Sequence, residues 1–521
     1  MRGRGMLRGL AVAAAAILSL AFASTASADS FIVLYKGSGV PASASADVQK
    51  AGGTYVYGYD QIGVAIARSD SSSFAANLAK DNRVEGVSST AGFASKLEPA
   101  RESAEGSQQG DLPNSPATDN DTFSPLQWDM RQIHTPQAHA VTGGSPAVVV
   151  GDIDTGLDYR HPDLTQNVSS ADSANCLSGA PVPGSVAADD DNGHGTHTAG
   201  TIAAASNGVG IVGVAPNVKV AGIKAGNADG FFFPEAVVCA FMWAGDRHVD
   251  VTNNSYFADP WEYNCRNDPE QHAIWKAEQR AIKYAQSQGV TVVASAGNDS
   301  DDVSHPTTDV TSPDDETPQE RRITNACVVV PLEVSGVVGV SATGSTTQDT
   351  SAGQYVDNLK SFYSSYGVSA VDVTAPGGDS VFFSTPTSAE GRVLSTWPDD
   401  IACPPGRSRQ QPNPDPGYPV AFYCYQQGTS MAGPHAAGVA ALIVSRYGDS
   451  SNPQNGKMSS GRVASLLGQT ADPQACPNTL PAGYLTFTGV NSGAEQECQG
   501  GSGHTSWYGS GQVDALNAVT K

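Results

Sequence analysis

A nearly continuous apolar run, AVVVGDI at residues 147–153, constrains the fold of this chain more than any other segment. A strand with apolar residues at successive positions buries both of its faces, which is typical of a parallel sheet covered by helices. Further strands are predicted at residues 218–223, 249–253, 290–295, 337–342 and 371–373, and helices at 234–247, 271–288 and 432–447. We therefore predict an α/β domain with a mainly parallel sheet flanked by helices.

A smaller unit precedes this domain. Its pattern predicts strands at residues 31–35, 54–59, 64–68 and 84–88 and helices at 44–51 and 72–80, an α+β alternation. A stretch without periodicity follows, rich in Ser, Gly, Pro, Gln and acidic residues, which is typical of an exposed, easily cut linker. We predict the α+β unit over residues 29–96, the linker over 97–121 and the α/β domain over 122–521, the last interrupted by surface insertions at 299–322 and 398–419.

The N-terminus indicates export. Three arginines within the first eight residues precede an apolar run over residues 10–22, which ends at Ala26-Ser27-Ala28. A basic segment, a short apolar core and an A-x-A exit form the pattern of a secretory signal peptide. The run is too short to span a bilayer comfortably, and no other segment reaches 18 apolar residues. We predict that residues 1–28 are removed on export and that the mature protein is extracellular, without a membrane anchor.

Composition narrows the set of partners. The 521 residues include 52 acidic and 29 basic side chains, a formal net charge of −23. A chain with no cationic excess cannot displace counterions from nucleic acid, so we expect no nucleic-acid partner and no affinity for an anionic membrane surface. We expect a diffusing acidic monomer.

All eight cysteines lie beyond residue 170, and an even number in an exported chain indicates disulfides. No C-x-x-C pair is present, which disfavours a zinc site. Local proximity favours Cys403–Cys424 and Cys476–Cys498, each closing an irregular loop. The pairing of the other four stays open: Cys176, Cys239, Cys265 and Cys327.

Three motifs carry the chemistry. The first, Asp154-Thr155-Gly156, ends the first core strand; the second, His194-Gly195-Thr196-His197, leads into a helix; the third, Gly428-Thr429-Ser430-Met431-Ala432, opens the buried helix. Ligands of open α/β sheets bind outside the carboxyl ends of the strands, where an Asp, a His and a Ser would meet. That set suits acyl transfer, because a serine hydroxyl needs an imidazole to take its proton and the imidazole needs a buried carboxylate to orient it.

These motifs, in the order Asp, His, Ser, resemble the signatures of the subtilisin-like serine peptidases, the subtilases. The resemblance covers roughly residues 122–521 and includes the closing segment Tyr508–Asp514. It implies a secreted serine endopeptidase that hydrolyses protein or peptide substrates through an acyl-enzyme. Residues 31–96 resemble the family's prosegment, which implies a folding helper and inhibitor removed by self-processing in the linker.

The resemblance also implies roles for single residues. Asp154 is expected to orient, His194 to act as general base and Ser430 as nucleophile, with the Asn298 amide in the oxyanion hole. Substrate is expected to pair with the segments Ser255-Tyr256-Phe257 and Ser295-Ala296-Gly297. Phe257 stands where the family commonly has Gly, so we expect a narrowed neighbouring pocket.

No cofactor is expected for the chemistry, but a structural calcium ion is. Asp163 and the loop of Asn207 resemble parts of a family calcium site, and their oxygen atoms suit Ca²⁺. The run Asp189-Asp190-Asp191 is expected to be a solvated acidic surface. His197 is expected to be structural, because no H-E-x-x-H motif accompanies it. His435 is also expected to be structural, because it lies five residues beyond Ser430, on the side of the buried helix turned away from it.

Two other functions fit these motifs less well than a peptidase does. An α/β-hydrolase esterase would have a similar motif around Ser430, but that fold requires the order Ser, Asp, His. A catalytically dead binding module on the same scaffold would not need the complete set of Asp154, His194, Ser430 and Asn298. Peptide-bond hydrolysis is the favoured hypothesis.

Overall fold

The computed structural model describes residues 28–90, 95–96, 119–257, 261–312, 319–345, 358–382, 391–449, 457–478, 480–481, 483–485, 495–501 and 503–521. The predicted signal peptide, apart from its last residue, lies outside the described residues. So does the predicted linker up to residue 118.

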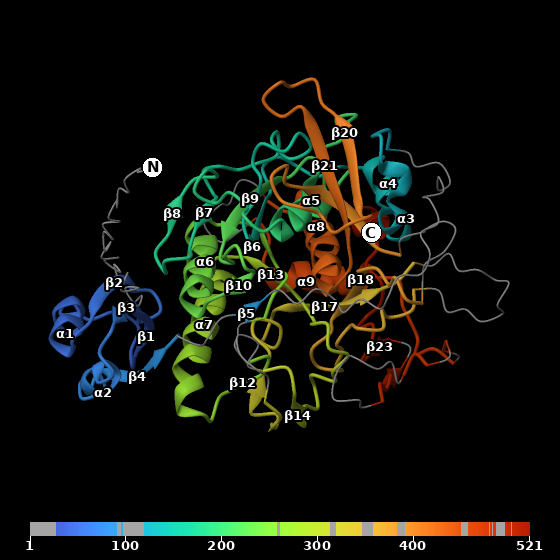
Figure 1. The fold of residues 1–521 in the computed structure, drawn as a ribbon. Coiled ribbons are helices and arrows are strands. Elements are labelled where there is room, and N and C mark those ends of the chain that lie inside the picture. Colours follow the sequence, from blue (N-terminus) through green and yellow to red (C-terminus); the bar gives the residue numbers. More distant parts are fainter. Residues whose placement is uncertain are drawn as a thin grey trace, which may run out of the picture.

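An eight-stranded sheet forms the centre of the larger unit (Figure 1). Its order is β18-β17-β13-β11-β6-β9-β7-β8, and all neighbours are parallel except β7 and β8 at one edge. The strands are β6 (Val149–Asp154), β7 (Ala174–Asn175), β8 (Val182–Pro183), β9 (Lys219–Lys224), β11 (Val251–Asn254), β13 (Thr291–Ser295), β17 (Val338–Thr343) and β18 (Val373–Pro376). The predicted parallel sheet is confirmed, and every predicted core strand overlaps an observed one.

The order of the strands places a crevice beside β6. The chain runs from β6 to β7, β8 and β9 on one side and then crosses to β11 on the other. Such a reversal leaves room at the carboxyl ends of the two strands that flank it. Asp154 ends β6 and Asn254 ends β11, so both lie at this position.

Helices cover both faces of the sheet. α5 (His194–Ala203) and α8 (Thr429–Tyr447) pack on one face, and α6 (Pro234–Asp246) and α7 (Pro269–Ser287) on the other. Val150 belongs to the core beneath α8 and Ile153 to the core beneath α6 and α7. Because successive strand residues point to opposite faces, Asp152 and Asp154 share the face of Val150. The smaller helices are η1 (Ser124–Leu126), α3 (Trp128–Gln132), α4 (Thr135–His139), α9 (Ser460–Thr470) and α10 (Ala515–Thr520).

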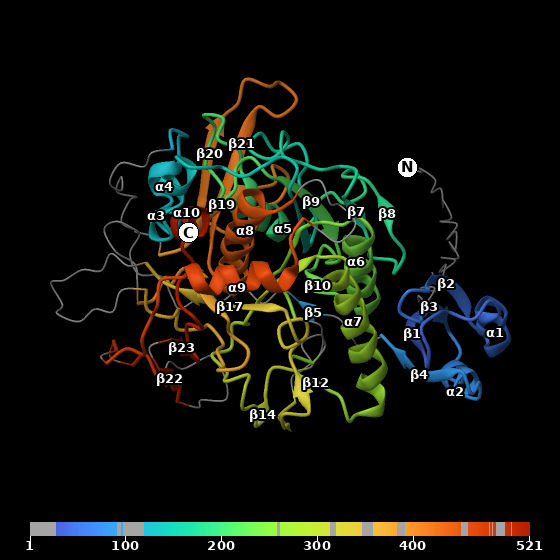
Figure 2. The ribbon, with the colours of Figure 1, turned by 180° about the vertical axis from the view of Figure 1, so that it is seen from behind.

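The N-terminal unit is a four-stranded antiparallel sheet, order β2-β3-β1-β4, with two helices. Its elements are β1 (Asp29–Tyr35), α1 (Ala44–Ala51), β2 (Thr54–Tyr59), β3 (Val64–Ser69), α2 (Phe74–Leu78) and β4 (Val84–Ser89), as predicted. Val33 packs against α1 and α2, whereas Ile32 and Leu34 join the core of α6 and α7. Figures 1 and 2 show this unit beside α6 and α7 at one end of the molecule.

Polar contacts also join the N-terminal unit to α7. Glu85 of β4 forms ion pairs with Lys276 and Arg280, the latter at 3.2 Å. Arg280 also donates hydrogen bonds to the carbonyl oxygens of Tyr35 and Ile62, both at 3.0 Å. Farther along the chain, β5 (Ser95–Lys96) pairs antiparallel with β10 (Phe231–Phe232) of the larger unit.

All eight cysteines are paired. The predicted pairs Cys403–Cys424 and Cys476–Cys498 are confirmed. The four cysteines that the sequence left open form Cys176–Cys239 and Cys265–Cys327. Each of these two bridges joins segments more than 60 residues apart, so short-range proximity could not have identified them.

The two predicted surface insertions differ. Residues 398–419 belong to an antiparallel sheet of β19 (Val393–Trp397), β20 (Ser408–Pro412) and β21 (Val420–Gln426), which projects at the top of Figure 1. In the region 299–322 the surface prediction is wrong for Asp299 and Asp309, which are both buried. There Asp309 forms an ion pair with Arg321, with 2.6 Å between Asp309 Oδ2 and Arg321 Nη2. The short strands are β12 (Asn264–Cys265), β14 (Thr308–Asp309), β15 (Arg321–Arg322), β16 (Cys327–Val328), β22 (Gly500–Gly501) and β23 (His504–Thr505).

Candidate active site

Asp154 and His194 lie in direct contact at the end of β6. His194 Nδ1 is 2.7 Å from Asp154 Oδ1, and the same oxygen accepts a hydrogen bond from the N–H of Thr155 at 2.8 Å. Asp154 is completely buried, whereas the His194 side chain keeps 16% of its surface exposed. A buried carboxylate bonded to Nδ1 holds the imidazole in one orientation and leaves Nε2 for a proton acceptor role.

Asp190 organises the start of α5, which carries His194. It accepts hydrogen bonds from the N–H and hydroxyl of Thr196, the N–H of Gly193 and the hydroxyl of Thr155. Burial would raise the pKa of Asp190, but these hydrogen bonds outweigh it and lower the pKa. The expectation of a solvated acidic run is therefore wrong for Asp190, because the unpaired N–H groups at the helix start need an acceptor.

Gly193 precedes His194 in a conformation that requires glycine. Its φ is +104°, and a Cβ atom there would lie 2.5 Å from the indole ring of Trp397. Trp397, at the end of β19, was not singled out from the sequence. Its ring packs against the backbone of Gly193, next to His194, and leaves no room for a side chain there.

Ser430 is the second residue of α8 and is 7% exposed. Its Oγ donates a hydrogen bond of 3.2 Å to the carbonyl oxygen of Ser255, which follows β11. The Ser255 hydroxyl in turn donates to the carbonyl oxygen of Ser430 at 3.0 Å. N–H groups in the first turn of a helix have no intrahelical acceptor, so the backbone at Ser430 can receive negative charge.

Asn298 lies beside the start of α8, two residues beyond Ala296. Its Oδ1 accepts hydrogen bonds from the N–H and the hydroxyl of Thr429, at 2.9 and 3.0 Å. These contacts orient the amide so that Nδ2 points away from Thr429. The left-handed φ of +100° at Gly297 turns the chain out of β13 to this position.

The predicted substrate segments flank the same crevice. Ser255 and Tyr256 are buried after β11, and Ser295 and Ala296 are buried at the end of β13. Tyr256 stacks on Phe232 of β10, with ring centroids 4.3 Å apart. β10 therefore lies beside the segment that contacts Ser430. Phe257 is half-buried against the core of α6 and α7, and the narrowed pocket stays a prediction.

The two other histidines have structural partners. His197 Nε2 lies 3.0 Å from the carbonyl oxygen of Cys424 and 3.3 Å from that of Val393. Burial lowers the pKa of His197 to about 3, so it stays neutral. His435 Nε2 lies 3.0 Å from Asp129 Oδ2. Both predictions of a structural role agree with these contacts.

The predicted metal residues Asp163 and Asn207 lie near one another with Asp121. Asp163 Oδ2 accepts hydrogen bonds from Tyr423 Oη at 2.8 Å and from the N–H of Ile211 at 3.1 Å. Its buried Oδ1 has no hydrogen-bond partner within the described part of the chain. Burial raises the pKa of Asp163 well above its usual value. Asp121 accepts the N–H of Asn207 at 2.9 Å and is buried, so the predicted exposed linker ends before it. A buried carboxylate oxygen without a donor fits a hard cation such as Ca²⁺.

Among the residues that the structure describes, no helix is both long and apolar enough to cross a membrane.

Comparison with known proteins identifies the family of this chain. The model of the subtilase family matches residues 145–504. Subtilisin BL of Lederbergia lenta is 30% identical over 333 residues, which cover 63% of this chain and 88% of subtilisin BL.

Solved structures share the fold. The epidermin leader peptide processing serine protease of Staphylococcus aureus superposes with a TM-score of 0.62 at 21% identity, covering 94% of this chain and 98% of that protein. Fervidolysin of Fervidobacterium pennivorans superposes with a TM-score of 0.60 at 23% identity, and this chain spans 62% of its length. The fold agreement, the family match and the identity to subtilisin BL together place this chain in the subtilase family, as a serine-type endopeptidase.

Proposed function

We propose that Asp154, His194 and Ser430 form the catalytic triad of this peptidase. The observation that carries the proposal is the 2.7 Å contact between His194 Nδ1 and buried Asp154, beside a serine in the first turn of α8. The proposal requires Ser430 Oγ to turn from the Ser255 carbonyl oxygen, its partner in this structure, toward His194 Nε2. His194 would then accept the hydroxyl proton as Oγ attacks the scissile carbonyl carbon.

The tetrahedral oxyanion would be held by two donors, the N–H of Ser430 and Asn298 Nδ2. Thr429 orients the amide before the reaction, so this donor costs no reorganisation when charge develops. His194 would return its proton to the leaving amine, and water would hydrolyse the acyl-enzyme by the same steps. The chemistry of this triad uses no cofactor.

We further propose that residues 29–96 are an inhibitory prosegment. The support is the pairing of β5 with β10, because an extended peptide added to β10 would occupy the place that we propose for a substrate strand. Phe232 of β10 stacks on Tyr256, and the neighbouring Ser255 contacts Ser430, so this edge leads to the nucleophile. The chain leaving β5 would be cut in cis within the linker. Together with the signal-peptide pattern, this describes a secreted precursor that matures itself.

Calcium would be structural. Asp163 and Asp121, together with the loop of Asn207, would hold the ion, whose charge would satisfy the Asp163 oxygen that lacks a donor.

The test compares the secreted wild type with Ser430→Ala, both treated with a serine-reactive fluorophosphonate and assayed on casein. The wild type should label, cleave casein and lose residues 29–96, whereas Ser430→Ala should do none of these. A wild type that matures but never labels would favour a binding module. Labelling without casein cleavage would restrict the substrate class. A Ser430→Ala protein that matures in a host without other proteases would contradict self-processing.

A further inference from the structure

Asp152 is a second buried carboxyl in the site, and the mechanism above gives it no role. It lies two residues before Asp154 on the same face of β6 and is fully buried. Two ionised carboxylates on the same face of one buried strand would repel each other. A charge-bearing side chain in a core strand therefore needs an explanation.

The partners of Asp152 fit a protonated acid. Thr198 Oγ1 lies 2.7 Å from Oδ2 of Asp152 and 3.0 Å from the carbonyl oxygen of Gly195. With a proton on Oδ2, Asp152 donates to Thr198, whose own hydroxyl proton goes to Gly195. Oδ1 then accepts the Asn253 amide N–H at 2.9 Å. Burial, and then the charge of Asp154, raise the pKa of Asp152 well above its usual value.

The chain of contacts continues to the nucleophile. Asn253 Nδ2 lies 3.1 Å from Ser255 Oγ, which donates to the carbonyl oxygen of Ser430. In a regular helix the N–H four residues later would bond that oxygen, but Pro434 has none. Ser255 supplies the missing donor and ties the start of α8 to β11. At its other end this chain of hydrogen bonds reaches Thr198, on the same helix as His194.

We propose that Asp152 is a positioning residue that works in its protonated form, holding Ser430 in register with the His194 helix through Asn253 and Ser255. The inference rests on the proposed triad. It adds a second carboxyl, that of Asp152, which carries no charge. A negative charge at Asp152 would instead act on the general base, His194.

The surroundings of Asp152 contain few charges. Its neighbours are Asp154 on β6, Asp190 from the segment before α5, His194 and Thr198 on α5, Asn253 on β11, Gly222 in register on β9, and Gly433 of α8 next to Asn253. Both acidic neighbours disfavour ionisation of Asp152. His194 is already bonded to Asp154.

The test compares Asp152→Asn with Asp152→Val. Asparagine can donate to Thr198 and accept from Asn253, so we expect a loss in kcat of no more than about threefold. The acidic limb of the pH profile of kcat/KM reports the protonation of the general base, His194. It should stay at the wild-type pH, because the neutral amide of Asn replaces the neutral carboxyl of Asp152. Valine removes the hydrogen bond to Asn253, so kcat should fall about 10-fold with little change in KM.

Asp250→Asn is the matched control. Asp250 is a buried carboxyl at the amino end of β11, where it pairs with Lys457 at 2.8 Å, far along the strand from Ser255. This variant should lose thermal stability while its kcat and acidic limb match wild type.

Two results would overturn the inference. The first is an acidic limb that moves to lower pH by about half a unit or more in Asp152→Asn, which would mean that a negative charge had been removed. The second is a wild-type kcat in Asp152→Val. If Asp152→Val does not fold, the acidic limb of Asp152→Asn decides alone. A wild type that neither labels with fluorophosphonate nor cleaves casein would contradict the triad itself, whatever the variants do.

Discussion

At the scale of single residues, the orientation of a side chain matters more here than its identity. Asn298 could be a turn former after a strand, and its Oδ1 would then face solvent. Instead Thr429 binds Oδ1 through two hydrogen bonds. The amide is thereby oriented by the same turn that presents Ser430.

Replacing Asn298 with Ala should lower kcat with little change in KM, because the lost donor acts on charge that exists only in the transition state. We take the magnitude from subtilisin itself, where loss of this type of donor costs roughly 10²–10³-fold in kcat. Steady-state kinetics on a peptide substrate measures it. Thr429→Val, which removes one of the two hydrogen bonds that orient the amide and keeps the other, should cost less. An unchanged kcat in Asn298→Ala would exclude the residue from the oxyanion hole.

Glu278 of α7 is a buried carboxyl, and neither of its oxygens has a hydrogen-bond partner among the residues that the structure describes. Burial, and then the charge of Glu235, raise its pKa well above the usual value. The folded state therefore holds a proton that the unfolded chain releases above about pH 4.3. The contribution of Glu278 to the free energy of unfolding is fully present below that pH. It is lost as the pH rises toward the pKa that Glu278 has in the folded protein.

Glu278→Leu should raise the free energy of unfolding by about 1–3 kcal/mol at pH 8 and by less at pH 5, because it removes an unsatisfied buried polar group. Urea unfolding in the Ser430→Ala background, which prevents self-digestion, measures the difference. Exposed Glu270→Gln serves as the control and should change stability by less than about 0.5 kcal/mol. A leucine variant less stable than its parent at both pH values would contradict the argument.

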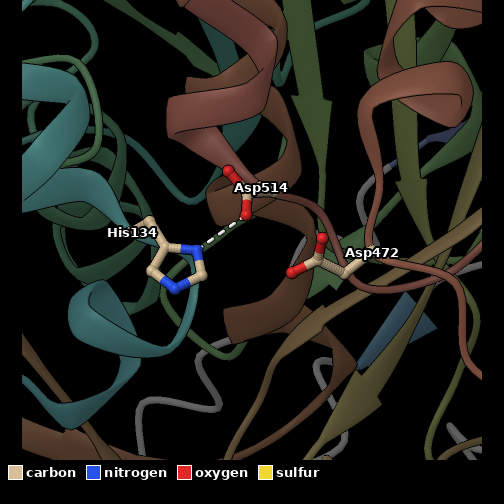
Figure 3. Close-up of side chains that lie close together, drawn as sticks. All are labelled: His134, Asp472 and Asp514. Atoms are coloured by element: carbon tan, nitrogen blue, oxygen red, sulfur yellow. Dashed lines mark hydrogen bonds and ion pairs between the residues drawn. The ribbon is translucent and has the colours of Figure 1, made fainter.

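At the scale of elements, a small cluster fastens the C-terminal helix. His134, Asp472 and Asp514 lie together, with ligand-type atoms within 4.8 Å of one another (Figure 3). His134 Nδ1 is 2.6 Å from Asp514 Oδ2, and Asp514 Oδ1 caps α10 by accepting the N–H of Asn517 at 2.7 Å. The hydrogen bond with Asp514 raises the pKa of His134. The cluster thus joins α10 to the turn between α3 and α4.

His134→Asn should destabilise the protein more at pH 5.5 than at pH 9. Because its pKa is raised, the contribution of His134 to the free energy of unfolding is fully present below about pH 6.5. It is lost as the pH rises through the pKa that His134 has in the folded protein. Asparagine tolerates the left-handed φ of 57° at this position, so backbone strain does not confuse the comparison. The pair is partly exposed, so we expect less than about 1 kcal/mol. Thermal melts at both pH values measure it, and an equal loss at each would contradict the ion pair.

At the scale of the whole molecule, the loop of Asn207 connects distant parts of the chain. Asp121, at the start of the larger unit, accepts a hydrogen bond from this loop. Tyr423 of β21, in the projecting sheet, donates a hydrogen bond to Asp163. A cation held by these oxygens would bind the folded protein and not the unfolded chain. Its effect on stability would follow from mass action.

Chelation should therefore lower the melting temperature. Calcium at about 100 times its Kd adds about 2.7 kcal/mol, and for a unit of this size we therefore expect a Tm lower by about 3 °C in EDTA than in calcium. Asp163→Asn should abolish the difference between the two buffers. A wild-type Tm that is indifferent to chelator would exclude a stabilising ion at this site.

Much of the fold was predictable because its signals are local. The apolar runs that become β6 and β13 predict strands buried on both faces. The apolar residues of α7 are spaced so that they lie along one face of the helix. The motif residues Asp154 and His194 were predictable as a pair because strand ends and helix starts converge in this fold. Their 2.7 Å contact was not, since it depends on how α5 packs against β6.

Other features had no local signal. Nothing in the run Asp189-Asp190-Asp191 distinguishes the residue that turns inward to cap α5. The same holds for Cys176–Cys239, which joins segments 63 residues apart, and for Glu278, whose neighbours come from other elements.

The sequence alone determined the class of fold and the identity of the reacting groups, because hydrophobic period and motif order are properties of the chain. Only the tertiary structure decided which acids are buried, which are bonded and which keep a proton. Asp152, Asp154 and Asp190 are chemically identical, and their differences arise from the donors and charges that packing places around each one. A carboxyl's charge state depends on its surroundings, and those are assembled only when distant segments meet.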